Sequence, residues 1–519
     1  MRKFLFHTLL TFSICSAYSQ NILINDQGFP NEPSIMMDPL HPNVIIAAAN
    51  INQYYISLDT GRTWSVRTLQ SSHGVWGDPA IAVDINSNFY FFHLSNPSSG
   101  NWIDRIVCQK TTDNGQTWND GSYTGLNGTK AQDKQWFAID RTDNTIYLTW
   151  TQFDVYGSKN PQDSSAILFS KSTDAGETWS QAVRINKISG DCVDSDNTVE
   201  GAVPAVGPNG EVYVSWAGPE GIVFDRSLDK GLTWLDSDIP VDPMPTGWDY
   251  TISGIYRANG LPVTTCDLSN SSYRGTIYIN WSDQRNGSND TDIFLAKSTD
   301  GGNTWSAPIR VNDDAPGKQQ FFTWMTIDQT NGYLYFVFYD RRHHDDDSTD
   351  VYLALSKDGG QTFNNRRISE SPFKPNAGVF FGDYTNITAH NGIVRPIWTR
   401  FQKGKLSIWT HLANGQDFTT AIAPESNSSL SLDFESYPNP SSDEIYVSYK
   451  LHTRSVVSLS LLDMNGHIIK RIIAEEKKGY GKYVEKIEPS KLNIPAGVYI
   501  LQLEVDNTVT TVKQVIVRE

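Results

Sequence analysis

Residues 298–305 read Ser-Thr-Asp-Gly-Gly-Asn-Thr-Trp, and five other segments of the chain repeat this pattern. The aspartates of the six copies follow one another at intervals of 54 to 71 residues, and they are Asp59, Asp113, Asp174, Asp229, Asp300 and Asp358. A repeat of this length is typical of propellers and solenoids, in which one supersecondary unit recurs along the chain. Strand-like residues flank the copies, for example 292–296 and 308–312. We therefore expect each copy to lie in a β-hairpin.

The residue types of the pattern suit a tight turn. The aspartate can accept backbone N–H bonds across the turn, and the glycine permits a positive φ. The terminal Trp or Phe is expected to pack in the hydrophobic layer between neighbouring units. Calcium or ligand binding by the copies is the alternative, but recurrence along the chain favours a structural role.

A second pattern, of strand residues, recurs once in each repeat. Its copies are residues 90–93, 147–150, 213–216, 278–281, 335–338 and 395–398. The last copy belongs to a unit with a degenerate turn, in which Ala413 stands where the aspartate should be. Counting residues 44–50 as the first such strand gives seven units. We predict an all-β chain whose main part is a seven-bladed β-propeller with four strands in each blade.

The N-terminus has the features of a secretory signal peptide over residues 1–19. Arg2 and Lys3 precede the apolar run 4–14, and small residues precede Gln20. The run is shorter than the roughly 20 residues that span a bilayer, so no transmembrane segment is expected. Residues 21–26 copy the exit strand at 309–313. We expect them to form the outer strand of the seventh blade and close the ring, with residues 419–423 as the competitor.

The composition changes near residue 426. We predict a propeller over residues 20–425, a linker over 426–432 and a separate domain over 433–519. Alternation with a period of two, as in residues 445–449 and 498–503, predicts a small β-sandwich for this last domain.

Charge and cysteine content exclude several classes of protein. The formal net charge is −16, so a nucleic-acid partner is not expected, because binding phosphate needs a basic face. Signal-peptide cleavage would leave Cys108, Cys192 and Cys266, widely spaced and odd in number. Neither a disulfide framework nor a CxxC metal site is indicated, and Cys266 is expected to be a small buried residue.

Both parts of the chain resemble known families. The turn copies resemble the Asp-box, or BNR, repeats of the sialidase superfamily, over residues 21–423. The C-terminal residues resemble the sorting domain of the type IX secretion system, and the matching segments are Tyr437-Pro438-Asn439-Pro440, 462–466, 497–501 and 513–517. That resemblance implies handling by the type IX secretion machinery. It also implies a secreted or outer-membrane-associated location at the cell surface of a Bacteroidetes-type bacterium.

The segments that open each blade carry the candidate binding residues. They are 76–79, 133–136, 199–201, 248–250, 320–322 and 381–384, and they hold carboxylates and aromatic rings. A ring would gather them around one mouth, where a sugar could stack on aromatics and bind carboxylates. The expected substrate-binding residues are Trp76, Asp133, Trp136, Trp248 and Asp383. Contacts that fix neighbouring blades are the equally weighted alternative.

The resemblance to sialidases implies catalytic roles for three of these positions. Tyr384 would be the nucleophile, Glu200 its partner base, and Asp78 the acid/base. Arg285, Arg341 and Arg400 could hold an anionic group of the sugar, or could pair with Asp283 and Asp340. The first arginine of the family has no counterpart in residues 25–34.

The sequence thus predicts a secreted carbohydrate-active propeller, a sialidase-like exoglycosidase acting on an extracellular glycan. A polysaccharide lyase and a non-catalytic glycan-binding or adhesin propeller stay open as alternatives. No cofactor is expected and no metal ligand is assigned. Calcium at Asp191, Asp194, Asp196 and Glu200, and a metal at the run 343–347, are kept as minor alternatives.

Overall fold

The computed structural model describes residues 21–415 and 434–516, except for residues 452, 464–466, 493 and 507. The predicted signal peptide, the predicted linker and the competitor segment 419–423 lie outside the described residues, as do residues 464–466 and 517 of the sorting-domain motifs. Two compact units make up the chain, Met1–Thr419 and Thr420–Glu519. The part that the structure describes contains strands and no α-helix, and hence no helix that could cross a membrane.

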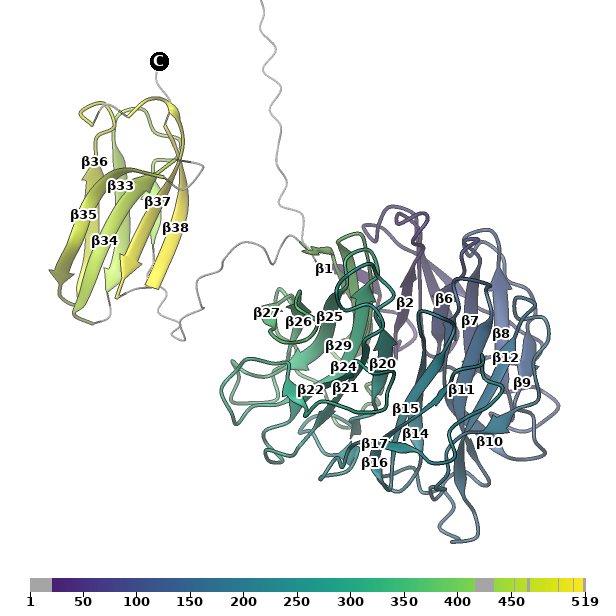
Figure 1. The fold of residues 1–519 in the computed structure, drawn as a ribbon. Coiled ribbons are helices and arrows are strands. Elements are labelled where there is room, and N and C mark those ends of the chain that lie inside the picture. Colours follow the sequence, from purple (N-terminus) through teal and green to yellow (C-terminus); the bar gives the residue numbers. More distant parts are fainter. Residues whose placement is uncertain are drawn as a thin grey trace, which may run out of the picture. The chain divides into compact units, whose positions relative to one another are not determined.

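The first unit is a series of antiparallel sheets, each formed by strands that follow one another in the chain (Figure 1). The first two sheets are β2 (Ser34–Met37), β3 (Ile45–Ala49), β4 (Gln53–Ser57), β5 (Ser65–Thr68), and β6 (Ala80–Val83), β7 (Phe89–Leu94), β8 (Ile106–Thr111), β9 (Ser122–Thr124). The next two are β10 (Ala131–Ile139), β11 (Ile146–Phe153), β12 (Ser165–Ser172), β13 (Val183–Arg184), and β14 (Glu200–Val206), β15 (Val212–Gly218), β16 (Gly221–Ser227), β17 (Ile239–Asp242).

Two further four-stranded sheets follow a short insertion. The insertion is the hairpin β18 (Asp249–Tyr250) and β19 (Ala258–Asn259). The sheets are β20 (Val263–Cys266), β21 (Ile277–Asp283), β22 (Asp292–Ser298), β23 (Ile309–Arg310), and β24 (Gln320–Asp328), β25 (Tyr333–Asp340), β26 (Asp350–Ser356), β27 (Asn364–Arg367).

The last sheet of this unit joins the two ends of the repeat. Its strands are β28 (Asn386–His390), β29 (Ile393–Gln402) and β30 (Lys405–His411), with β31 (Ala413–Asn414) beside β29. The outer strand is β1 (Asn21–Asn25), which pairs antiparallel with β30 (Figure 1). The prediction that residues 21–26 supply this outer strand is confirmed. Backbone pairing between the two ends of the chain segment removes an open edge.

The innermost strands form a closed series of contacts. Each contacts the next in the order β2, β6, β10, β14, β20, β24 and β28, and β28 contacts β2 again. This arrangement is consistent with a β-propeller, and it brings the segments before these strands around one axis.

Burial falls from the inner strands to the outer ones. Strands β3, β7, β11 and β21 are buried along their whole length, whereas β5 and β13 are mostly exposed. The strand residues that recur once in each repeat lie on the second strand of each sheet. Four tryptophans on these second strands are fully buried: Trp150, Trp216, Trp281 and Trp398. Neighbouring sheets cover both faces of these strands, which explains their continuous apolar character.

The six repeated turns connect the third and fourth strands of six sheets, as the sequence predicts. In each turn the aspartate accepts a hydrogen bond from the backbone N–H of the following threonine at 2.8–3.0 Å. The glycine N–H donates to the hydroxyl of the first Ser or Thr. Several turn tryptophans also contact the preceding sheet, for example Trp234 against Phe169 and Trp305 against Phe224. These contacts fix one sheet against the next.

The second unit contains two antiparallel sheets around one hydrophobic core. One sheet is β32 (Glu435–Tyr437), β33 (Ile445–Leu451) and β36 (Gly481–Ile487). The other is β35 (Ile468–Lys478), β34 (Ser455–Leu462), β37 (Gly497–Val505) and β38 (Thr508–Ile516). Alternating residues such as Val457, Leu459 and Leu461 are buried in the core, as a period of two requires.

Candidate functional site

Three charged residues hold equivalent places near the start of consecutive inner strands. Glu32 and Asp78 lie two residues before β2 and β6, and Lys134 lies two residues before Trp136, where pairing resumes after a bulge in β10. All three have a positive φ, of 51°, 50° and 50°. Residues with a β-carbon rarely adopt this conformation, which re-aims their side chains. Here it brings the Lys134 Nζ atom within 3.4 Å of Asp78 and 4.0 Å of Glu32.

Asp383 lies at the centre of an ionic cluster. Its carboxylate accepts hydrogen bonds from Lys134 Nζ at 2.7 Å and from Arg257 Nε at 2.8 Å. Its backbone N–H donates to Glu32, and Asn259 Nδ2 donates to its carbonyl oxygen at 3.0 Å. Arg257 and Asn259 come from the inserted hairpin and its connection, so this insertion completes the cluster.

Burial and charge divide the carboxyl groups of the mouth into two kinds. Burial would raise the pKa of Asp383, but Lys134 and Arg257 outweigh it and hold that pKa well below its usual range. Burial raises the pKa of Glu32 and of Glu200 well above the ordinary value, with Asp78 and Asp194 respectively adding to the effect. Burial also raises the pKa of Asp133 to about 7. The site therefore holds one carboxyl group with a lowered pKa close to others whose pKa is raised.

Two cavities adjoin at this cluster, and both are lined by Lys134, Asn259, Leu261 and Asp383. The first has a cavity volume of about 30 Å³ and is also lined by Trp136, Trp324, Phe322 and Tyr384. The second, also of about 30 Å³, adds Asp194, Glu200, Trp248, Asp249 and Arg257. The first cavity thus has an aromatic wall, and the second is lined mostly by polar and charged residues.

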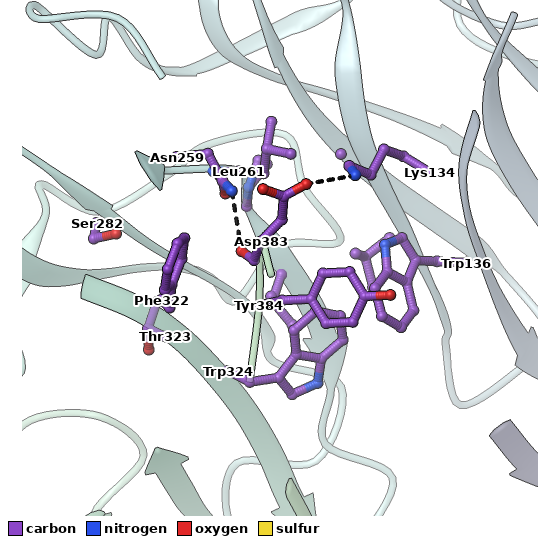
Figure 2. Close-up of a pocket in the computed structure, with 14 residues that line it drawn as sticks. Lys134, Trp136, Asn259, Leu261, Ser282, Phe322, Thr323, Trp324, Asp383 and Tyr384 are labelled. Atoms are coloured by element: carbon purple, nitrogen blue, oxygen red, sulfur yellow. Dashed lines mark hydrogen bonds and ion pairs between the residues drawn. The ribbon is translucent and has the colours of Figure 1, made fainter. Parts of the chain in front are cut away.

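Aromatic rings form one wall of the first cavity. Figure 2 shows Tyr384 beside Trp136 and Trp324, with the Asp383 carboxylate directed toward Lys134. The ring of Tyr384 packs edge to face against that of Trp136, with the ring centroids 5.1 Å apart. The ring centroids of Trp136 and Trp324 are 4.3 Å apart. The Tyr384 hydroxyl is buried and has no hydrogen-bond partner among the described residues. Burial raises its pKa well above the ordinary value, and Asp78 and Glu32 raise it further.

Glu200 is the buried acid of the second cavity. It is the first residue of β14, where a bulge separates it from the regular pairing that begins at Val203. Its side chain is 1% exposed, and its Oε2 atom has no hydrogen-bond partner in the described part of the chain. Asp194, close to Glu200, accepts a hydrogen bond from the Tyr156 hydroxyl at 2.6 Å. A carboxyl group with a raised pKa at a cavity wall is suited to hold a proton for transfer.

The structure gathers most of the sequence-predicted mouth residues. Asp78 and Asp133 lie in or beside the Lys134 cluster, and Trp136, Trp248, Asp383, Glu200 and Tyr384 line a cavity. Trp76 is 41% exposed and lines neither cavity. Glu200 and Tyr384 line different cavities, so the predicted pairing of these two side chains is not seen.

The three predicted arginines do not meet at the mouth, and none lines either cavity. Arg285 pairs with Asp283 and Asp242, the outcome that the sequence left open for Asp283. Arg341 donates to Gln319, Thr349 and the carbonyl oxygen of Ser253. Its neighbour Arg342 forms the ion pair with Asp340. Arg400 donates to Ser371 and to the carbonyl oxygen of Pro372. Each guanidinium binds the groups nearest to it in its own or a neighbouring loop.

Sequence reasoning assigned no role to Glu32, Lys134, Arg257, Asn259 or Trp324. A signal for Glu32 exists, because Glu32-Pro33 repeats the place of Asp78-Pro79 before an inner strand. A signal for the inserted hairpin exists too, because the longest interval between repeats, 71 residues, falls there. Nothing in the sequence indicates that Arg257 would pair with a residue of the last sheet.

Metal binding finds no support in the arrangement of ligands. Within the described ranges, no group of three or more His, Cys, Asp or Glu side chains is placed to hold a metal ion. In the run 343–347, His344 contacts Asp350 at 2.9 Å and Asp345 contacts Lys318 at 2.7 Å. Cys108, Cys192 and Cys266 are free and buried.

Comparison with known proteins identifies the C-terminal unit. Residues 435–518 match the family described as the secretion system C-terminal sorting domain. The protein therefore carries a type IX sorting domain and is secreted by, or attached to the surface of, a Bacteroidetes-type bacterium. No curated protein is significantly similar to the chain.

Solved structures similar to this chain include two sialidases and a lyase. A Hadza microbial sialidase is 15% identical with a TM-score of 0.42, covering 72% of this chain and 74% of that one. The NanB sialidase from Streptococcus pneumoniae is 9% identical with a TM-score of 0.42, covering 71% and 83%. An ulvan lyase from a new family of polysaccharide lyases is 14% identical with a TM-score of 0.45, covering 77% and 98%.

Proposed function

We propose that this protein is a secreted glycoside hydrolase, a seven-bladed Asp-box propeller that cleaves an extracellular glycan at its mouth. The observation that carries the proposal is the position of Glu200. It is a buried carboxyl group with a raised pKa and a free oxygen, at the wall of a polar cavity that adjoins an aromatic one. The C-terminal unit is a small β-sandwich whose role is export, which agrees with an extracellular substrate.

The two cavities provide the complementary chemistry that a sugar needs. The apolar face of a sugar ring stacks on aromatic side chains, and Trp136 and Trp324 offer such a surface. Glu200 is the proposed general acid, which protonates the glycosidic oxygen as the bond to the leaving sugar breaks. Asp194, which accepts a hydrogen bond from Tyr156, lies close to Glu200 and raises the pKa of that group, so it keeps the proposed acid protonated.

The tyrosine mechanism implied by the resemblance to sialidases stays a prediction. A neutral tyrosine is a poor nucleophile until a base withdraws its proton. No described residue accepts a hydrogen bond from the Tyr384 hydroxyl, and the nearby acids raise the pKa of this group. We therefore assign Tyr384 to the aromatic wall. The same observation favours a second candidate function, a glycan-binding propeller without catalysis.

The proposal is tested by screening the purified protein against a panel of extracellular polysaccharides and oligosaccharides. Binding and release of reducing ends are measured, and the products are identified by NMR. We expect a hydrolysed product with a new reducing end. Binding without product would select the second candidate, and a product with an unsaturated sugar would show a polysaccharide lyase instead.

A further inference from the structure

The cations at the mouth are already paired with acids of the protein itself. Lys134 and Arg257 are the cationic side chains among the described residues that line the two cavities. Lys134 contacts Asp383 and Asp78 at 2.7 and 3.4 Å. Arg257 donates to both carboxylate oxygens of Asp383, and its Nη1 atom lies 3.3 Å from Asp194. A ligand carboxylate or sulfate would compete with these acids for the same two cations, and the acids already neutralise the positive charge of the cations.

Acids outnumber cations around the same cavities. Asp194, Glu200, Asp249 and Asp383 line them, and Glu32, Asp78 and Asp133 lie behind Lys134. Even when Glu32, Glu200 and Asp133 are protonated, four carboxylates oppose two cations. A negatively charged ligand would thus meet like charge at the mouth, which disfavours its binding.

The groups that stay available are acceptors and aromatic faces. Asp194 and Glu200 line the second cavity, and Asp249 is exposed at its rim. Hydroxyl groups of a sugar can donate to such oxygens, and rings such as Trp248 and Trp136 can take its apolar face.

We propose, on the basis of the function proposed above, that the mouth accepts sugars without negative charge and rejects sialic acids, uronic acids and sulfated sugars. This specificity differs from the one that a sialidase-like arginine clamp would give. It follows from the pairing of Lys134 and Arg257 with acids of the protein itself.

The test compares kcat/KM on matched aryl glycosides and oligosaccharides that share ring stereochemistry and leaving group. Each pair consists of a neutral hexoside and the corresponding uronide, and a sialoside is included. We expect the charged member of each pair to be slower by about tenfold or more. An equal or better rate on a uronide or sialoside would overturn the inference while leaving the hydrolase function intact. A failure to bind or cleave any glycan would overturn both.

A variant provides a second readout. Asp383→Asn removes the shared partner of Lys134 and Arg257, so we expect it to gain affinity for glucuronate, measured by calorimetry, relative to the wild type. Asp236→Asn, at an exposed position of the same unit, is the matched control. Equal glucuronate binding by the wild type and Asp383→Asn would contradict the inference.

Discussion

The protonation of single residues at the mouth depends on their charged neighbours as well as on their burial. Asp383 and Asp133 are both buried aspartates, yet Lys134 and Arg257 keep the pKa of one low, while the pKa of the other rises to about 7. The side chain of Lys134 contacts three acids, Glu32, Asp78 and Asp383, whereas only its backbone N–H donates to Asp133. Environment therefore assigns different protonation states to chemically identical groups.

Asp133 makes the stability of the first unit depend on pH. The pKa of Asp133 is higher in the folded protein than in the unfolded chain, so the unfolded chain loses this proton first. The free energy of unfolding therefore falls as pH rises from about 4 to 7. We expect the free energy of unfolding of Asp133→Asn, relative to that of the wild type, to be higher at pH 8 than at pH 4.5. The gain is at most about 1.4 kcal/mol for each pH unit between about 4 and 7. Urea unfolding at several pH values, with Asp236→Asn as control, measures this. A difference between variant and wild type that is independent of pH would refute the assignment.

Tyr384 can either form part of the aromatic wall or take part in the reaction through its hydroxyl, and one substitution distinguishes these roles. If it is part of the aromatic wall, Tyr384→Phe keeps the ring contacts with Trp136 and Trp324 and removes an unpartnered hydroxyl. We expect kcat/KM to stay within about fivefold of the wild type and the melting temperature not to fall. A loss of about 100-fold or more at unchanged melting temperature would instead show that the hydroxyl takes part in the reaction.

At the scale of elements, the repeated turn supplies the regularity of the sheets. In the turn of the sixth sheet, Asp358 accepts hydrogen bonds from Thr362, Gln361 and Ser356. Burial would raise the pKa of Asp358, but these hydrogen bonds outweigh it and lower the pKa to about 2. The carboxylate therefore supports the turn at neutral pH, and this support is lost as pH falls through about 4 toward 2.

We expect Asp358→Ala to destabilise the first unit by about 1–2 kcal/mol at pH 7, because several donors of the turn lose their acceptor. Chemical denaturation measures the change, and Asp236→Ala is the control at an exposed site. The difference between Asp358→Ala and wild type should shrink at pH 2.5. No loss of stability at pH 7 would mean that the glycine and threonine alone hold the turn.

Much of this architecture follows from local signals in the sequence. The turns, the second strands and the pairing of β1 with β30 each repeat a pattern that short-range chemistry explains. The ionic cluster could not be predicted in the same way, since Asp383 lies 249 residues from Lys134 and 126 from Arg257. The three arginines of the predicted clamp line neither cavity, for a related reason. Aligned positions on successive strands bring the backbones together, but the long arginine side chain can bind an acceptor close to its own backbone. Arg285, for example, forms an ion pair with Asp283.

At the scale of the whole molecule, export and chemistry are assigned to different units. The catalytic groups that we propose all lie in Met1–Thr419, and the sorting domain lies in Thr420–Glu519. We expect a chain that ends at Glu425 to keep the melting transition of the first unit and the full activity. Calorimetry and the glycan assay on both forms test this. Loss of the transition on truncation would show that the two units depend on each other for folding.

The central claim is that Glu200 donates a proton to the glycosidic oxygen. Glu200→Gln keeps the size of the side chain but removes the acid, and Glu220→Gln, at an exposed position of the same sheet, is the matched control. The decisive measurement is kcat/KM of both variants on a glycan that the wild type hydrolyses, with melting temperature followed in parallel. The account predicts a loss of about 100-fold or more for Glu200→Gln, none for Glu220→Gln, and melting temperatures no lower than wild type. Wild-type turnover by a folded Glu200→Gln protein would contradict it.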